Sequence, residues 1–285
     1  MNYLYDGSFE GFLTCVYEHY YTERADGIFP EGAYQLDMTV RAMSVLSDEV
    51  KVQKVSGAIV SKISKYDMER IYRVFRTNEP DKEMKLLRYI VLGFGVARSG
   101  RNGGSIRLLH GNQTVLDVQK AEQRIGFEVH RLCGLIRFSA VRVDHPSQFV
   151  ATQSGSGNKG GVVESGMMVA HGGNEILYAR IDPDNDVLEF LAEHFSDRYK
   201  RNPFIIHDTK RGKALVSFNR EWFITDFSSG DLLVDTDSEQ DYQRLWKLYH
   251  EIMATKERTN PKCQKNFMPV RYWKNLTELQ TFNLG

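Results

Sequence analysis

The chain has 285 residues, with 37 lysines and arginines against 37 aspartates and glutamates. Its 41% hydrophobic, 12% aromatic and 26% charged residues are ordinary for a globular protein, which excludes disordered, collagen-like and coiled-coil chains. The longest apolar run, at residues 89–97, is too short to span a membrane, and the first residues lack the pattern of a signal peptide. We therefore expect a cytoplasmic protein with no membrane partner.

Helical spacing dominates the first half of the chain. A short strand is predicted at residues 3–5, and a helix follows it because Ser8 is a favourable N-cap with apolar side chains at helical spacing after it. Val50 and Val52, on one face, predict a strand at residues 49–54. Further helices are expected over residues 56–63, 67–76, 81–96 and 115–132.

Strand-like alternation replaces helical spacing in the second half of the chain. Asp186 and Glu189 form a capping box that predicts one helix, and Ser238 with Asp241 predicts a second. Strands are expected over residues 135–143, 175–181, 204–207, 214–218 and 222–225.

This order of elements predicts an α+β fold. The helices fill the N-terminal half, and a small, mostly antiparallel sheet with two packed helices fills the C-terminal half. We expect a single domain over residues 1–285. A glycine-rich stretch at residues 144–173 is predicted to be a surface insert within it, and the tail from residue 259 is expected to be irregular.

The neutral total conceals a segregated distribution of charge. Residues 51–142 hold 18 basic and eight acidic residues, a net charge of +10, and residues 196–225 and 256–274 carry +4 and +5. Residues 1–40 and 226–241 each carry a net charge of −6. Basic segments with interleaved aromatic residues suit phosphate neutralisation and base stacking. The alternative is that the basic and acidic segments pair within the fold.

The densest polar cluster extends from residue 194 to residue 211. Its helical part places polar side chains on one face, and its strand ends in a histidine and a carboxylate, where functional residues are common. The candidates for acid–base catalysis are His207, Asp208, His194 and Asp197. The candidates for holding a phosphate here are Arg198 and Arg211. The alternative is a structural ion-pair network in which Asp208 caps the turn before Arg211.

The spacing of cysteines and histidines argues against a metal or cluster site. Cys15, Cys133 and Cys263 are far apart and form no CxxC pair, and the histidines form no HxH or HxxxH pair. We therefore predict no metal and no cofactor on this chain.

The C-terminal tail is a second polar cluster. Its basic side chains can neutralise phosphate, its amides can donate to phosphate or base edges, and its aromatic rings can stack on an unpaired base. The alternative is that the aromatic side chains pack the tail onto the core. The candidate phosphate- or DNA-binding residues of the tail are Arg258, Asn260, Lys262, Gln264, Lys265, Arg271, Tyr272 and Trp273.

Seven segments spread along the chain form a distinctive set: YDGSFEG at 5–11, EVHRLCGLIRF at 128–138, IDPDNDV at 181–187, HFSDR at 194–198, IHDTKR at 206–211, RTN at 258–260 and MPVRYW at 268–273. They resemble the signatures of one bacterial family, which is described as DNA metabolism or DNA repair proteins. Together they cover the chain nearly from end to end, in the family's order. In the family pattern a short turn stands where this chain has residues 144–173. This insert is therefore not expected to carry the function common to the family.

The resemblance implies a role in DNA repair or modification. The family's domain of unknown function also occurs fused to uracil-DNA-glycosylase-like domains, and free-standing members accompany a radical-SAM protein associated with DNA. The leading hypothesis is a DNA-associated protein that binds or presents DNA together with this radical-SAM iron–sulfur protein. The chain has no CxxxCxxC triad, so it is not itself the radical enzyme.

Two alternatives remain open. One is a hydrolase or lyase that acts on a damaged nucleotide or its phosphodiester, with His207 and Asp208 or Asp197 as the acid–base pair. It requires His194, Asp197, His207 and Arg211 to converge in a cleft. The other is a scaffold for the partner protein, which predicts an exposed apolar patch.

Overall fold

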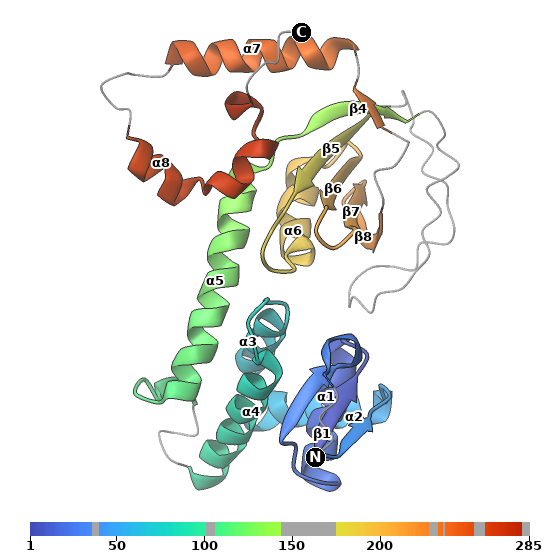
Figure 1. The fold of residues 1–285 in the computed structure, drawn as a ribbon, viewed down its shortest axis with the longest axis vertical. Helices are drawn as coiled ribbons and strands as arrows, with labels where there is room; N and C mark the ends of the chain where they lie inside the picture. The colour runs from blue at the N-terminus through green and yellow to red at the C-terminus, as the bar shows by residue number, and fades with distance from the viewer. Residues whose placement is uncertain are drawn as a thin grey trace. The chain divides into compact units, whose positions relative to one another are not determined.

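The computed structural model describes residues 1–35, 40–100, 106–143, 175–227, 233–235, 237–253 and 260–280. The chain divides into two compact units, residues 1–126 and residues 127–285 (Figure 1). The predicted glycine-rich insert at residues 144–173 lies outside the described residues. None of the helices in the described ranges is long and apolar enough to cross a membrane.

The N-terminal unit joins a small parallel sheet to a group of helices (Figure 1). Its elements are β1 (Asn2–Tyr5), α1 (Phe9–Tyr21), β2 (Gly27–Pro30), β3 (Ala42–Ser44), α2 (Glu49–Lys62), α3 (Lys65–Phe75), α4 (Lys82–Ser99) and α5 (Gln113–Leu135), which continues into the second unit. β1 lies in the middle of the sheet, with β2 and β3 parallel to it on either side. The predicted first strand and first helix are confirmed. The other two strands of the sheet, β2 with four residues and β3 with three, were not predicted.

The core of this unit draws buried side chains from β1, β2 and the helices α1 to α5. Residues 49–54 belong to α2, so the strand predicted there is wrong. Asp48 caps this helix by accepting a backbone hydrogen bond of 3.1 Å. Val55 and Ile59 are buried one turn apart, whereas Val50 is exposed. Burial therefore follows the helical period here and not the alternation of the valines.

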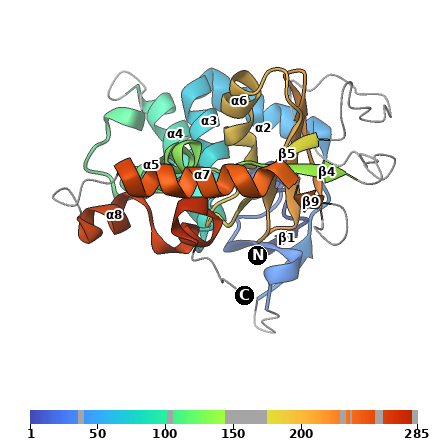
Figure 2. The same ribbon diagram turned by 90° about the horizontal axis from the view of Figure 1, so that it is seen from above.

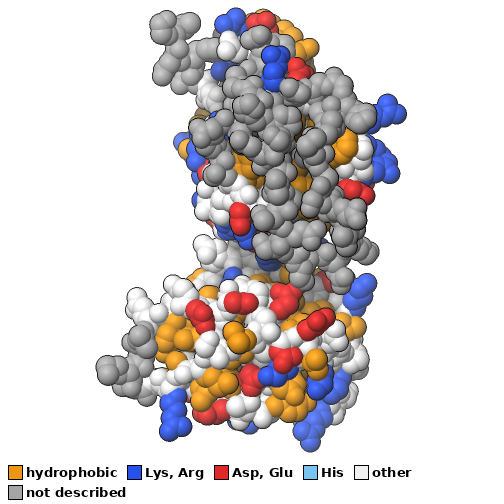
Figure 3. All heavy atoms as spheres, turned by 90° about the vertical axis from the view of Figure 1, so that its right-hand side faces the viewer, with side chains coloured by type: hydrophobic (Ala, Val, Ile, Leu, Met, Phe, Trp, Pro, Cys, Tyr) orange, Lys and Arg blue, Asp and Glu red, His pale blue; other side chains and the backbone are white. Residues whose placement is uncertain are grey.

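Charge pairing accounts for part of the basic block in this unit. Lys51 lies 2.7 Å from Glu18 of the acidic N-terminal segment, and Arg70 lies 2.7 Å from Glu122. Acidic side chains lie among hydrophobic ones on the face of this unit drawn in the lower part of Figure 3. The pairing of acidic with basic segments is thus realised for Lys51 and Glu18, whereas Arg70 and Glu122 pair within the basic block.

The segment YDGSFEG builds the turn between β1 and α1. Gly7 has a φ of 83°, a left-handed conformation that glycine adopts without strain. The Ser8 hydroxyl caps α1 by accepting from the Gly11 amide at 2.9 Å, and Asp6 accepts from the Ser8 amide at 2.9 Å. A Cβ at Gly11 would collide with the Asp6 carboxylate and lie 3.0 Å from the Tyr5 ring. These residues therefore have a local structural role.

The C-terminal unit contains a mixed sheet with α6 packed on one face. Its elements are β4 (Ser139–Val143), β5 (Glu175–Ile181), α6 (Leu188–Arg198), β6 (Phe204–Asp208), β7 (Lys213–Phe218), β8 (Glu221–Asp226), β9 (Leu233–Asp235), α7 (Asp237–Met253), α8 (Pro261–Phe267) and the 3₁₀ helices η6 (Val270–Asn275) and η7 (Thr277–Leu279). The strand order within the described residues is β8-β7-β6-β5-β4-β9. β5 and β6 are parallel, and the other neighbouring strands are antiparallel. The α+β class is therefore confirmed. The predicted arrangement is matched only in part, because this sheet is mixed and the N-terminal unit has a parallel sheet of its own.

Successive side chains of β6 point to opposite faces of this sheet. Phe204 and Ile206 lie on the face that α6 covers, where Phe195 of α6 packs edge-on to Phe204 with ring centroids 6.4 Å apart. Ile205 and His207 lie on the opposite face, where Ile205 belongs to a small apolar cluster. The two faces therefore present different groups of side chains to their surroundings.

Two boundaries in this unit differ from those predicted. Val187 and not Asp186 occupies the N-cap of α6, and no side chain caps the helix there. The tail is partly helical and not irregular. Asn260 caps α8 by accepting from the Cys263 amide at 3.0 Å, and a proline follows it at the start of the helix.

We expect Gly11→Ala to destabilise the N-terminal unit by about 1–3 kcal/mol, the usual cost of inserting a methyl group into a tightly packed site. Urea unfolding followed by circular dichroism measures the change. Gly57→Ala in α2 is the matched control, because nothing lies within 4 Å of a Cβ built there, and it should be neutral or stabilising. Equal midpoints for the two variants would contradict the packing argument.

Candidate functional site

Polar side chains of the C-terminal unit gather at the carboxyl ends of β5 and β6, which are parallel. The carboxyl ends of parallel strands bring two loops to one edge of a sheet, a common position for ligand sites. Residues 182–187 follow β5, residues 209–212 follow β6, and η6 packs against β5. This region is called the polar edge below.

Glu128 lies at the centre of the polar edge, and its side chain is only 4% exposed. Its Oε1 accepts hydrogen bonds from the Asp184 amide at 2.8 Å and the Tyr272 hydroxyl at 2.7 Å. Its Oε2 accepts from the backbone amide of Asn185 at 3.0 Å and from its side-chain amide at 2.7 Å. Arg271 supplies positive charge 3.3 Å from Oε1. This carboxylate therefore joins α5, the loop after β5 and η6.

Asp182 makes a second connection between the loop after β5 and η6. The Lys274 ammonium lies 3.0 Å from its carboxylate, Asn275 donates to it at 2.9 Å, and the Thr209 hydroxyl also donates. Burial by itself would raise the pKa of Asp182, but the hydrogen bonds from Thr209, Asn275 and Lys274 outweigh it and lower the pKa. Asp182 therefore acts as an ionised anchor for the tail.

Asp208 and Arg211 hold the two loops together. The buried Asp208 carboxylate accepts from the backbone amides of Lys210 at 3.0 Å and Arg211 at 3.3 Å, and it lies 2.8 Å from the Arg211 guanidinium. Arg211 also donates to the carbonyl oxygens of Pro183 at 3.3 Å and Asp184 at 2.6 Å. These contacts are those of the structural alternative, in which Asp208 caps the turn before Arg211.

His207 lies next to Asp208 in β6 but on the opposite face of the sheet. It is 4% exposed, and its Nδ1 lies 2.8 Å from the Tyr178 hydroxyl. Its ring packs edge-on to Phe227, with centroids 4.9 Å apart. Burial lowers the pKa of His207, so the imidazole is neutral at pH 7.

The predicted acid–base cluster is not brought together. His194, Asp197 and Arg198 are exposed on α6, and α6 covers the face of the sheet that His207 does not occupy. The sheet therefore separates His194 and Asp197 from His207. Arg211 is engaged with its own loop and with the loop after β5.

The predicted DNA-binding residues of the tail divide into two groups. Tyr272 is buried and Arg271 is paired, while the Trp273 indole donates to the Met268 carbonyl at 2.8 Å. These residues fix the tail to the unit. The residues that remain accessible are Lys262, Gln264 and Lys265, together with the cap residue Asn260. Arg258 lies outside the described residues.

The predicted helix near the C-terminus is confirmed as α7, but its apolar side chains face solvent. α7 contacts its own unit through polar groups: Glu239 accepts from the Ala140 amide at 2.8 Å, and the Trp246 indole donates to Glu278 at 3.0 Å. α7 lies across the front of the unit in Figure 2. The large apolar side chains that it exposes are Tyr242, Leu245, Trp246, Leu248, Tyr249, Ile252 and Met253.

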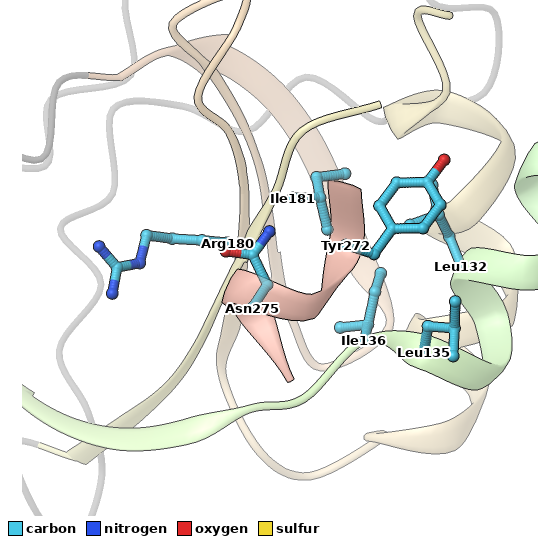
Figure 4. A pocket seen from close by; sticks show the side chains of 7 residues that line it. All are labelled: Leu132, Leu135, Ile136, Arg180, Ile181, Tyr272 and Asn275. Carbon is cyan, nitrogen blue, oxygen red and sulfur yellow. The ribbon is translucent and has the colours of Figure 1, made fainter. Parts of the chain in front are cut away.

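A small pocket lies beside the polar edge, between the end of α5, β5 and η6 (Figure 4). Most of its lining is apolar, and its polar side chains do not form an acid–base pair. The Arg180 side chain points away from the other lining residues (Figure 4). Across the described ranges, no three histidine, cysteine, aspartate or glutamate side chains are placed to hold a metal ion. The residues that line the pocket are Leu132, Leu135, Ile136, Arg180, Ile181, Tyr272 and Asn275.

Comparison with known proteins identifies one similarity. Residues 168–278 match the model of a domain of unknown function, DUF4130. The matched range includes Asp182, Asp208 and Arg271 of the polar edge and excludes Glu128. No curated protein and no solved structure matches the chain.

The sequence interpretation missed three residues of this region, Glu128, Tyr178 and Arg180. A signal for Glu128 was present, because it lies at helical spacing from Ile125 and Leu132, which are both buried. A carboxylate on the apolar face of a helix indicates a buried polar contact. Tyr178 and Arg180 carried no such signal, because their neighbours depend on strand pairing.

We expect Glu128→Gln to destabilise the C-terminal unit by about 3 kcal/mol, because removing one partner of a buried charged network leaves the others uncompensated. All three tryptophans lie in this unit, so tryptophan fluorescence during urea unfolding reports on it selectively. Glu193→Gln, at an exposed position of α6, makes the same chemical change and should shift the midpoint little. A loss below about 1 kcal/mol for Glu128→Gln would contradict this role.

We expect the ionised carboxylate of Asp182 to make a pH-dependent contribution to the free energy of unfolding. Its pKa is lowered in the folded state, so its contribution is present above pH 4 and is lost as pH falls through the folded pKa. The free energy of unfolding should therefore differ between the wild-type chain and Asp182→Asn at pH 6, and the difference should shrink towards pH 3. A difference that stays constant over this range would show that ionisation of Asp182 is not involved.

Proposed function

We propose that the chain binds DNA through exposed, unpaired cations of its C-terminal unit. We further propose that it does so in DNA repair or modification, together with a radical-SAM iron–sulfur protein. The motif resemblance points to this process. The observation that carries the DNA-binding proposal is the division of basic side chains into those engaged by the polar edge and those left free.

The strongest support for DNA binding comes from the exposed basic side chains at and just after the end of α6. Arg198 is the last residue of this helix, and Lys200 and Arg201 follow it closely. All three are exposed, and no acidic side chain of the described residues lies within ion-pair distance of them. Closely spaced exposed cations without ion-pair partners can neutralise phosphates and release the counterions bound to them. This supports a contact with a nucleic-acid backbone.

α8 adds two further exposed cations, Lys262 and Lys265, which likewise have no ion pair with any described residue. Phe267, at the end of the same helix, is 70% exposed. An exposed aromatic ring beside lysines suits stacking on an unpaired base as well as contact with phosphate. Both helices therefore supply groups that a DNA strand can use.

The exposed apolar face of α7 supports the partner part of the proposal. Large contiguous apolar surfaces on a folded protein mark interaction sites. Leu245, Tyr249 and Ile252 lie at helical spacing on this face, and each is more than half exposed. A protein partner would bury them, as the scaffold alternative also requires.

The DNA part is tested by fluorescence anisotropy with single-stranded and double-stranded oligonucleotides over a salt series. The variant combines Arg198→Gln, Lys200→Gln and Arg201→Gln. Loss of up to three phosphate contacts should weaken binding and reduce the slope of log K against log salt by about 2 to 3.

The control for this test is Arg198→Lys with Arg201→Lys, which keeps the charges and should keep the slope. Affinity of the wild-type chain that is weak at low salt and independent of salt would contradict the proposal.

The partner part is tested by co-expression and affinity purification with the radical-SAM protein encoded near this chain. Leu245→Lys with Ile252→Lys should abolish co-purification, because lysines at these positions cannot be buried in an apolar interface. Retention of the complex by this double variant would exclude α7 as the contact, and failure of the wild-type chain to co-purify would contradict the partnership.

A further inference from the structure

We propose that Arg180 and His207 form a binding site for a phosphate group on the sheet face opposite α6. This site is separate from the cations of α6 and α8 and goes beyond the function proposed above. It is formed by side chains that the pairing of β5 with β6 places next to each other.

The strand register places the two residues together. Arg180 in β5 is paired with His207 in β6, and Tyr178 is paired with Ile205. Paired residues of neighbouring strands point to the same face, and so do alternate residues of one strand. Tyr178, Arg180 and His207 therefore lie on one face.

Tyr178 fixes the orientation of the imidazole. Its hydroxyl lies 2.8 Å from Nδ1 of His207, and burial raises the pKa of this tyrosine, so it stays protonated and can donate. When the hydroxyl donates to Nδ1, the proton of the neutral imidazole is on Nε2. His207 then presents one N–H donor at a fixed position.

The second ring nitrogen of His207 is available to a ligand. The described residues include no hydrogen-bond partner for Nε2. Within the described part of the chain, its N–H is therefore left for a ligand, although the residue as a whole is 4% exposed.

Arg180 supplies the charge. Its side chain is exposed, and no described acidic group forms an ion pair with it. Asp182, the acidic residue nearest to it in sequence, follows the end of β5 and is already compensated by Lys274 at 3.0 Å and by Asn275 at 2.9 Å. The Arg180 guanidinium is therefore free to bind an anion from solution.

Phosphate matches these donors better than a carboxylate does. A guanidinium binds two oxygens of one phosphate in a bidentate arrangement. A third oxygen remains to accept from Nε2–H of His207, whereas a carboxylate has no third oxygen. The phosphate can belong to inorganic phosphate, to a nucleotide or to a DNA backbone, since all three present the same group.

The site is tested by NMR of the full chain labelled with ¹⁵N-histidine. Inorganic phosphate is added at pH 7.5 and constant ionic strength, and the imidazole signals are followed. His207→Asn identifies the signals of His207 among those of the eight histidines. We expect these signals to shift saturably with phosphate and to be unaffected by acetate.

Substitutions at Arg180 distinguish binding from a general effect of anions. Arg180→Gln should weaken the response of His207 at least tenfold and Arg180→Lys should weaken it less, because lysine keeps the charge and loses the bidentate geometry. Arg198→Gln is the matched control on the other face of the sheet and should leave the response unchanged. No saturable shift in the wild-type chain, or an equal shift in Arg180→Gln, would overturn the proposal.

Two further ligands identify the source of the phosphate. A mononucleotide and a short oligonucleotide are titrated in the same way. The ligand that binds more tightly indicates the natural ligand class. The outcome is independent of the DNA-binding proposal. If the triple variant of α6 keeps full DNA affinity while Arg180→Gln loses the phosphate response, the proposed DNA surface fails and this site stands.

Discussion

The polar edge depends on one buried negative charge, the carboxylate of Glu128. A buried carboxylate is stable only when donors and positive charge offset its loss of water. Here the donors come from the loop after β5 and from η6, and Arg271 adds the charge. These segments are far apart in sequence. If either one left its position, the buried carboxylate of Glu128 would lose hydrogen-bond donors. The carboxylate therefore couples the ends of α5, β5 and the C-terminal tail.

This coupling decides which basic side chains are free to act. Arg211 and Arg271 are engaged in holding loops, although a basic tail and a basic loop look alike in sequence. The cations of α6 and α8 lie outside the network and keep their full charge for a ligand. Arg180 has no ion pair with a described acidic group, and the carboxylate of Asp182, just after β5, is compensated by Lys274 of η6. Paired and unpaired basic side chains thus lie near each other in the sequence.

Local sequence patterns predicted the elements whose structure depends mainly on the residues within the element itself. The first helix, α5, β5 and α7 follow from apolar spacing and capping residues, and they are confirmed. The strand predicted at residues 49–54 was wrong, because valines two residues apart are compatible with a strand or with a helix. Burial of Val55 and Ile59, four residues apart, favours the helix. The pairing of the small N-terminal sheet escaped prediction because it joins strands that are short and distant.

The sequence by itself determined the α+β class, the segregation of charge and the existence of a polar cluster at residues 194–211, because these properties depend on composition and local spacing. Only the tertiary structure decided which members of that cluster meet. His194 and His207 are close in sequence, but they lie on opposite sides of the sheet. His194 is on α6, which covers one face, and His207 of β6 points to the other face. Conversely, strand pairing brought Arg180 to His207 across a separation in sequence, and such pairing depends on the whole fold.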